Sequence, residues 1–203
     1  MPSGSNAAAS AAIAAWPVWP DRVLLLIGPE GSGKSHMARI WADRSGAIFL
    51  RPDDLEGDLR HLACRPVVIE DADRVAMPEA PMFHLLNLVR EAESSLLVTA
   101  RRPPDTWSLG TADVVSRLRL APSVALEEPD EALMRAVLVK LFADRQLAVD
   151  ATLVDYLALR LDRSLAAAGA AVEALDRASL DGGRRISRTL AAHLFGEPRL
   201  DGP

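Results

Sequence analysis

The residues best suited to chemistry form a glycine-rich segment near the beginning of the sequence. The segment matches the pattern G-x-x-x-x-G-K-[ST] and reads Gly28, Pro29, Glu30, Gly31, Ser32, Gly33, Lys34 and Ser35. In such a segment the glycines let backbone N–H groups turn inward around an anion, and a helix that starts at the lysine adds partial positive charge. We therefore predict that residues 28–36, His36 included, bind the phosphates of a nucleotide. Lys34 would bridge the β- and γ-phosphates, and Ser35 would ligate Mg²⁺.

The alternative is a glycine-rich turn between a strand and a helix that binds no ligand. It is disfavoured because the apolar run before the segment, the spacing, the Lys, the Ser and the helical pattern after it all agree.

A phosphate site of this kind also needs an acid at the end of a neighbouring strand. The apolar run Val67–Ile69 is followed by Glu70 and Asp71. The strand phase makes Glu70 the acid on the metal side and Asp71 the acid nearer the γ-phosphate. We therefore expect both to be catalytic residues and, with Ser35, ligands of Mg²⁺. The alternative is a solvated acidic loop.

The elements that must position these residues are visible as apolar runs. Continuous runs, typical of strands covered by helices on both faces, occupy Val23–Ile27, Ala47–Leu50, Pro66–Ile69 and Ser95–Ala100. Helical patterns over Lys34–Arg44 and Pro81–Ala92 alternate with these runs. The alternation predicts an α/β domain with a parallel sheet over residues 1–122. The Ala-rich segment Ala7–Ala15 is either a helix or a tail.

Beyond Pro122 the strand signal ends and a helical domain is expected over residues 126–196. Its predicted helices, each placed after an N-cap residue, are Glu131–Arg145, Ala151–Leu161, Leu165–Ser179 and a last one between Ser187 and Gly196. Leu126–Pro129 reads as the hinge before this domain, and residues 197–203 read as a C-terminal tail.

Composition excludes several classes of protein. The 203 residues carry 23 Lys+Arg against 28 Asp+Glu, a net charge of −5, which argues against direct DNA binding. With 49% hydrophobic and 25% charged residues the chain is not disordered. It has no apolar run long enough to span a membrane and no basic leader, so we expect a cytoplasmic protein without membrane contact. The single Cys64 is expected to be a small buried apolar residue.

Several of these motifs together resemble the DnaA-related AAA+ ATPases, and among them the Hda-like regulators that inactivate the replication initiator DnaA. The resemblance covers residues 5–195. Beyond the phosphate loop it rests on the F-x-x-x-N helix at Met82–Asn87, the first-sensor strand at Leu97–Thr99 before Pro103-Pro104, the arginine-finger motif at Ser116–Leu118 and the second-sensor helix at Leu175–Ser179.

The resemblance implies an AAA+ P-loop NTPase fold, a parallel sheet with helices on both faces followed by an all-α lid, with ADP or ATP and Mg²⁺ as cofactors. It implies that Arg117 is an arginine finger that acts in trans on ATP bound to DnaA, and that Arg177 is the second sensor, which reaches the phosphates. From the residues alone two alternatives stay open: Arg117 or Arg119 caps the end of a helix, and Arg177 is a solvated side chain on an exposed helix face.

The sequence departs from the family at two places. The family carries an Asp at the first-sensor position, two residues after a Thr, whereas here Thr99 and Ala100 are followed by Arg101 and then Arg102. Weak intrinsic turnover at most is therefore expected. The family's clamp-docking peptide contains Gln, and the only Gln here is Gln146, so no peptide for the DNA polymerase sliding clamp is visible. The family also implies head-to-tail contacts, a homo-oligomer among them, without fixing a number.

Three functions follow as hypotheses. The first is a regulator of replication initiation that joins ATP-loaded DnaA and promotes its hydrolysis. The second is an independent P-loop ATPase or small-molecule kinase; the kinase is disfavoured because the helical block follows the α/β part as one piece. The third is a DNA-associated initiator or loader, which would need a basic face. Arg184, Arg185 and Arg188 form the only C-terminal basic cluster, and a solvated cluster explains them more simply.

Overall fold

The computed structural model describes residues 4–196. It divides them into two compact units, residues 6–127 and residues 128–196, with residues 4 and 5 assigned to the second unit. The predicted tail at 197–203 lies outside the described residues. None of the described helices is both long enough and apolar enough to cross a lipid bilayer.

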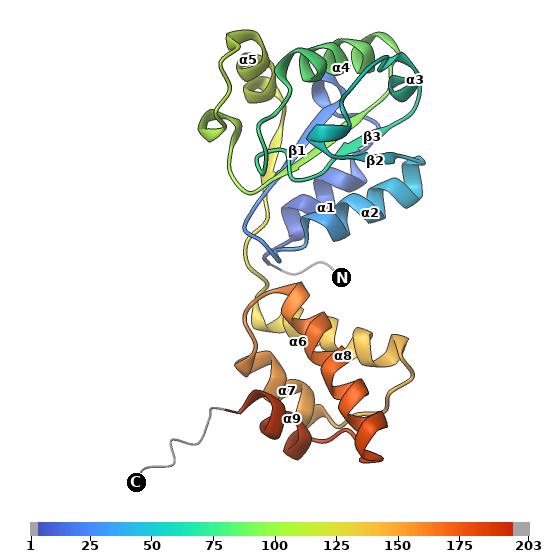
Figure 1. Cartoon of the computed structure of the whole chain (residues 1–203), viewed down its shortest axis with the longest axis vertical. Helices are drawn as coiled ribbons and strands as arrows, with labels where there is room; N and C mark the ends of the chain where they lie inside the picture. The colour runs from blue at the N-terminus through green and yellow to red at the C-terminus, as the bar shows by residue number, and fades with distance from the viewer. Residues whose placement is uncertain (1–3, 197–203) are drawn as a thin grey trace. The chain divides into compact units, whose positions relative to one another are not determined.

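A five-stranded sheet runs through the first unit (Figure 1). Its strands are β1 (Val23–Ile27), β2 (Ile48–Leu50), β3 (Val67–Ile69), β4 (Leu96–Ala100) and β5 (Ser123–Ala125). They lie in the order β2-β3-β4-β1-β5, and every neighbouring pair is parallel. The α/β fold class expected from the apolar runs is therefore confirmed.

The edge strand β5 corrects the prediction that no strand follows Pro122. Ser123 pairs with Leu25 of β1, and Leu126 N–H donates to Ile27 O at 2.7 Å. Ser123 and Ala125 are exposed, so the strand has no continuous apolar run. A short edge strand with one half-buried residue gives no signal of the kind that marks strands covered on both faces.

Helices cover both faces of the sheet (Figure 1). They are α1 (Ala7–Ala14), α2 (Lys34–Ser45), α3 (Arg60–Ala63), α4 (Glu79–Glu91) and α5 (Ala112–Leu120). Leu24 and Leu26 of β1 face the core under α1 and α2, whereas Val23 and Leu25 face the core under α4 and α5. Alternate residues of one strand thus serve two cores, which is why β1 is apolar throughout. The Ala-rich segment is a helix, with Ile13 in the first of these cores.

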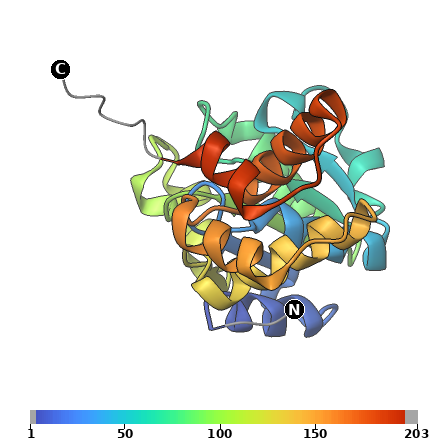
Figure 2. The ribbon, with the colours of Figure 1, turned by 90° about the horizontal axis from the view of Figure 1, so that it is seen from below.

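The second unit is helical, as its capping residues predict. It contains α6 (Glu131–Asp144), α7 (Ala151–Arg160), α8 (Leu165–Gly182) and α9 (Arg188–Phe195), and α6 packs against α7 and α8 (Figure 2). Asp130 Oδ1 accepts a hydrogen bond from Leu133 N–H at 2.7 Å, and the hydroxyls of Ser164 and Ser187 cap α8 and α9 in the same way. Asp150 precedes α7 but makes no capping hydrogen bond with its side chain.

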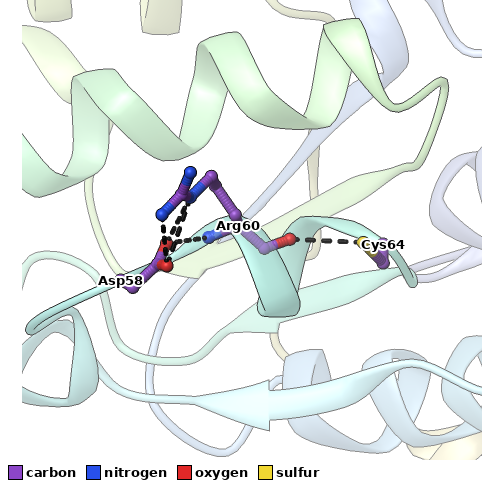
Figure 3. Close-up of polar contacts among 3 residues, drawn as sticks. All are labelled: Asp58, Arg60 and Cys64. Atoms are coloured by element: carbon purple, nitrogen blue, oxygen red, sulfur yellow. Dashed lines mark hydrogen bonds and ion pairs between the residues drawn. The ribbon is translucent and has the colours of Figure 1, made fainter.

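The segment around α3 corrects the prediction for Cys64 (Figure 3). Cys64 is exposed at the end of this four-residue helix, and its thiol donates to Arg60 O at 3.3 Å. The Arg60 guanidinium hydrogen-bonds both carboxylate oxygens of Asp58, and these bonds hold the pKa of Asp58 well below its usual range. Cys64 follows this surface turn as its C-cap and is exposed, so it is not the buried apolar residue that composition suggested.

Candidate functional site

The sheet brings the predicted phosphate loop next to the ends of two other strands. Ile27 of β1 pairs with Ala100 of β4, and Gly28 N–H donates to Ala100 O at 3.1 Å. Because β3 lies on the other side of β4, the residues that follow the three parallel strands emerge along one edge of the sheet. This carboxyl edge is where open α/β sheets bind their ligands.

The loop leads into α2 in the conformation that an anion site needs. Gly33 is the N-cap of α2 with φ 101°, a backbone conformation that residues with a side chain rarely adopt. Its carbonyl accepts the N–H of Met37 at 2.9 Å and so begins the helix. The positive end of the α2 dipole therefore faces the loop. Ser35 and His36 lie in the first turn and are exposed.

Gly28 is required by a close approach of two backbone segments. A Cβ at this position would lie 2.3 Å from Leu126 O and 3.0 Å from Ser32 Oγ. The Leu126 carbonyl is backbone held by the strand pairing beside β5, so it cannot move aside as a flexible side chain would.

We expect Gly28→Ala to destabilise the protein by about 1–3 kcal/mol, the range typical of overpacking, and to weaken phosphate binding by displacing the loop. Urea unfolding followed by circular dichroism measures the first effect. Gly169→Ala is the matched control, because a Cβ at Gly169 in α8 meets nothing within 4 Å. Equal stability of Gly28→Ala and the wild-type protein would contradict the close approach.

Lys34 is buried inside the loop that it is predicted to serve. Lys34 is only 6% exposed, and its Nζ donates to the carbonyls of Gly28 at 2.7 Å and Pro29 at 2.8 Å. An ammonium has three N–H donors, so one remains for a phosphate oxygen. Burial lowers the pKa of the Lys34 ammonium, and the carboxylate of Asp71 opposes this shift, which places Asp71 within electrostatic reach.

The two predicted acids follow β3 with different environments. Glu70 N–H continues the β2–β3 ladder to Leu50 O at 2.9 Å, and Glu70 Oε1 is buried without a hydrogen-bond partner in the described part of the chain. Asp71 has φ 53°, and its N–H donates to Thr99 Oγ1 at 3.1 Å. An unpartnered buried carboxylate oxygen is costly unless a cation or donor satisfies it.

These groups fit a magnesium ion. Mg²⁺ typically takes one or two protein carboxylates, and phosphates and waters complete its coordination. Ser35, Glu70 and Asp71 supply a hydroxyl and two carboxylates, and the orphaned Glu70 Oε1 is an oxygen that a cation would satisfy. Residues 4–196 hold no gathering of three or more His, Cys, Asp or Glu side chains able to bind a metal by themselves. Any ion here would therefore need the nucleotide's phosphates as ligands.

The sequence analysis missed the contacts that Asp73 and Arg101 make near the loop. Asp73, whose side chain is 2% exposed, accepts the backbone N–H groups of Arg101 at 2.9 Å and Arg102 at 3.0 Å, so it is not part of a solvated acidic loop. Arg101 Nη2 in turn lies 2.6 Å from Glu30 Oε2 of the phosphate loop. The only indication of these contacts in the sequence was that the ends of two parallel strands, here β3 and β4, would lie side by side.

Arg117 lies on α5 and is held by the F-x-x-x-N motif of α4. Its Nη1 donates to Asn87 Oδ1 at 2.5 Å, and its guanidinium carbon lies 4.6 Å from the centre of the Phe83 ring. Phe83 and Asn87 are four residues apart and share one face of α4, so both contact the guanidinium at the same time. Arg119, two residues later on α5, pairs with Asp105.

Arg117 and the phosphate loop are at opposite ends of β1. The hollow that Arg117 lines includes Val23, the first residue of β1, whereas the loop follows Ile27, the last one. Four strand steps separate these ends by about 13 Å. The structure therefore does not bring Arg117 together with Lys34, Glu70 and Asp71.

Glu79 fixes the start of the helix that carries Arg117. Its carboxylate accepts the N–H groups of Gly110 at 2.8 Å and Thr111 at 2.6 Å, immediately before α5. Hydrogen bonds from Thr111 and from these backbone groups lower the pKa of Glu79 below its ordinary 4.5.

This shift predicts a pH dependence of stability. The contribution of Glu79 is fully present above pH 4.5 and is lost as the pH falls through its lowered folded pKa. We expect Glu79→Gln to be less stable than the wild-type protein at pH 7 and the difference to shrink below pH 4.5, measured by urea unfolding across the pH range. Glu91→Gln, near the other end of α4, is the control. A difference independent of pH would argue against the ionised cap.

Arg177, the predicted second sensor, lies on α8 opposite the buried stripe of that helix. Ala168, Val172 and Leu175 are buried, whereas the Arg177 side chain is 69% exposed. Its Nη2 lies 2.6 Å from Glu173 Oε1, one turn earlier in the helix. Arg177 therefore lies on the exposed face of α8, and its role as second sensor stays a prediction.

Comparison with solved structures finds the same fold in bacterial proteins. Domain III of the Thermotoga maritima replication initiation protein DnaA matches 97% of this chain and 95% of its own length, with a TM-score of 0.82 and 18% identity. AMPPCP-bound DnaA from Aquifex aeolicus matches over 90% of this chain, with a TM-score of 0.75 and 14% identity. A mutant of Thermotoga maritima RuvB matches over 92%, with a TM-score of 0.69 and 15% identity.

This chain spans 65% of the length of the Aquifex aeolicus DnaA and 64% of the length of the RuvB mutant. No model of a known protein family matches the chain, and no curated protein sequence matches it. Identities of 14–18% show a common fold and nothing finer. The five-stranded parallel sheet with its covering helices is therefore the fold of an AAA+ P-loop NTPase, of the kind found in DnaA and RuvB.

Proposed function

We propose that this protein binds an adenine nucleotide with Mg²⁺ and regulates replication initiation by promoting the hydrolysis of ATP bound to DnaA. The main support for a nucleotide site is the environment of Lys34. Its buried ammonium donates to two carbonyls of the loop, which leaves a third N–H for a phosphate oxygen. Gly33, Ser35 and the orphaned oxygen of Glu70 support the same site. When bound, Mg²⁺ would neutralise phosphate charge there.

The choice of adenine rests on similarity in fold. One of the matching structures is a DnaA bound to AMPPCP, an analogue of ATP. We propose either ADP or ATP as the resident nucleotide. Arg101 stands in place of the family's Asp, and an arginine cannot accept a proton from water. This supports weak turnover by the protein alone.

The regulatory role rests on Arg117 acting on a partner's nucleotide. Its distance from the protein's own phosphate loop, about the length of β1, supports action in trans rather than in cis. Asn87 and Phe83 orient its guanidinium, and a pre-positioned arginine loses little freedom when it meets a phosphate. We propose that it inserts into the ATP site of DnaA, and that Arg177 serves as the second sensor of this protein.

The test is to mix the purified protein with ATP-loaded DnaA and a DNA-loaded sliding clamp and to follow ATP hydrolysis. We expect little turnover by the protein alone and accelerated hydrolysis in the mixture. Rapid turnover alone without any effect on DnaA would favour the independent ATPase. Salt-dependent binding of DNA by the protein alone would favour the initiator or loader, with Arg184, Arg185 and Arg188 as the residues to replace.

A further inference from the structure

The second unit carries a group of exposed arginines to which the proposed function assigns no ligand. α7 and α9 pack against each other (Figure 1). The loop before α9 contains Arg184 and Arg185, and Arg188 is the first residue of the helix. All three are exposed, and none of them makes an ion pair with a carboxylate among residues 4–196. Three positive charges close together are therefore available to an anion from another molecule.

The loop that carries these arginines is anchored on both sides. Ile186 is 6% exposed and packs in the core of the helical unit. Ser179 Oγ donates to Arg184 O at 2.6 Å, and the hydroxyl of Ser187 caps α9. The backbone on either side of Arg185 is thus held in place, and a side chain on a fixed backbone loses less freedom when it binds a partner.

Tyr156 of α7 positions the arginine that begins α9. Its half-buried ring packs against the core of the helical unit, and the guanidinium carbon of Arg188 lies 5.4 Å from the ring centre. The guanidinium carbon of Arg160, one turn later in α7, lies 6.0 Å from the same centre. A cation–π contact engages the positive charge and leaves the N–H donors of Arg188 available to an anion. Leu159 is 70% exposed and neighbours Tyr156 on the surface of α7, where it adds an apolar side chain.

These side chains fit an acidic protein segment better than they fit a nucleic acid. Carboxylates bind guanidinium groups through two parallel hydrogen bonds, and Leu159 offers a contact to an apolar side chain. Single-stranded nucleic acids bind where aromatic faces are open for base stacking along a basic groove. Here the ring of Tyr156 already contacts two guanidinium groups, and the whole chain has a net charge of −5.

We propose that the second unit docks an acidic segment of a partner protein, in which carboxylates flank an apolar side chain. The docking surface, the arginine surface, consists of Tyr156, Leu159, Arg160, Arg184, Arg185 and Arg188. Its arginines bind the carboxylates, Leu159 contacts the apolar side chain, and Tyr156 orients Arg188. This inference goes beyond the proposed function and depends on no residue of the phosphate loop.

The test measures binding of a fluorescein-labelled peptide of twelve residues to the full chain by fluorescence anisotropy. The peptide contains glutamates around two leucines that are four positions apart. We expect saturable binding at low ionic strength that weakens as the salt concentration rises, because salt screens exposed charges. The same peptide with glutamines in place of the glutamates is expected not to bind.

Charge reversal identifies the residues that bind the peptide. Arg188→Glu and Arg185→Glu are each expected to weaken binding by about tenfold or more, because attraction becomes repulsion. Leu159→Ser is expected to weaken it by about three- to tenfold through the loss of apolar burial. Arg145→Glu is the matched control, because it makes the same change of charge at an exposed arginine that ends α6, outside the arginine surface. It is expected to bind the peptide nearly as the wild-type protein does.

No binding of the peptide by the wild-type protein, or equal affinities of the wild-type protein, Arg185→Glu and Arg188→Glu, would overturn the inference. Binding of a twelve-nucleotide oligothymidylate in preference to the peptide would make a nucleic acid the ligand instead. Self-association of the protein alone in sedimentation equilibrium, lost in Arg188→Glu, would make a second copy of this chain the partner. Thermal unfolding midpoints equal to that of the wild type show that lost binding in a variant is not lost folding.

Discussion

Replacing Arg117 by Ala is expected to abolish the stimulation of DnaA-bound ATP hydrolysis. An arginine that stabilises transition-state charge is worth about 10³- to 10⁵-fold in rate, so the mixture with ATP-loaded DnaA is expected to return to the rate of DnaA alone. Nucleotide binding by the variant is expected to be unchanged, because Arg117 lies at the other end of β1 from the phosphate loop. The measurement is phosphate release in single-turnover mixtures, with binding measured separately.

Two further variants separate insertion of Arg117 from general damage to its helix. Arg119→Ala removes an arginine on the same helix whose partner is Asp105, and it is expected to retain stimulation. Asn87→Ala keeps the guanidinium of Arg117 but removes its hydrogen-bond acceptor. Its stimulation of hydrolysis is expected to be intermediate between that of Arg117→Ala and that of Arg119→Ala. Full stimulation by Arg117→Ala would remove this residue from the mechanism.

Replacing Lys34 by Ala is expected to weaken nucleotide binding by about a hundredfold or more, the range typical of truncating one partner of a buried charged pair. The physical reason is that Lys34 is buried between the carbonyls of Gly28 and Pro29 and has one N–H left for a phosphate. Calorimetry with Mg-ADP measures the loss.

The other lysine of the chain provides a matched control. Lys140 on α6 pairs with Asp144 one turn away at the surface, so Lys140→Ala is expected to bind nucleotide as the wild type does. Equal affinities of Lys34→Ala and Lys140→Ala would show that the loop binds no phosphate through its lysine.

The parts of the fold that obey local rules could be predicted from sequence. β1 and β4 are buried on both faces, so each is an apolar run, and Asp130, Ser164 and Ser187 mark helix starts through their own side chains. β5 could not be predicted in this way, because pairing with β1 rather than burial of its own residues makes it a strand.

The candidate site likewise has one part that local sequence determines and another that depends on long-range contacts. The conformation of Gly28–Ser35 follows from local sequence, since a glycine at Gly33 permits φ 101° and a helix begins beside it. The contacts of Arg101 with Glu30, and of Arg117 with Asn87, join residues distant in sequence. Only the strand order and the packing of α5 on α4 bring these partners together, and no local pattern encodes either.

The most direct test of the account is calorimetric titration of the purified wild-type protein with Mg-ADP and Mg-ATP. The account predicts saturable binding of one nucleotide per chain. The same titration without Mg²⁺ is predicted to show weaker binding, because Glu70 and Asp71 then face the phosphates as unscreened like charges. Absence of binding to either nucleotide, in a protein shown to be folded by circular dichroism, would contradict the central claim that the loop around Lys34 holds a nucleotide.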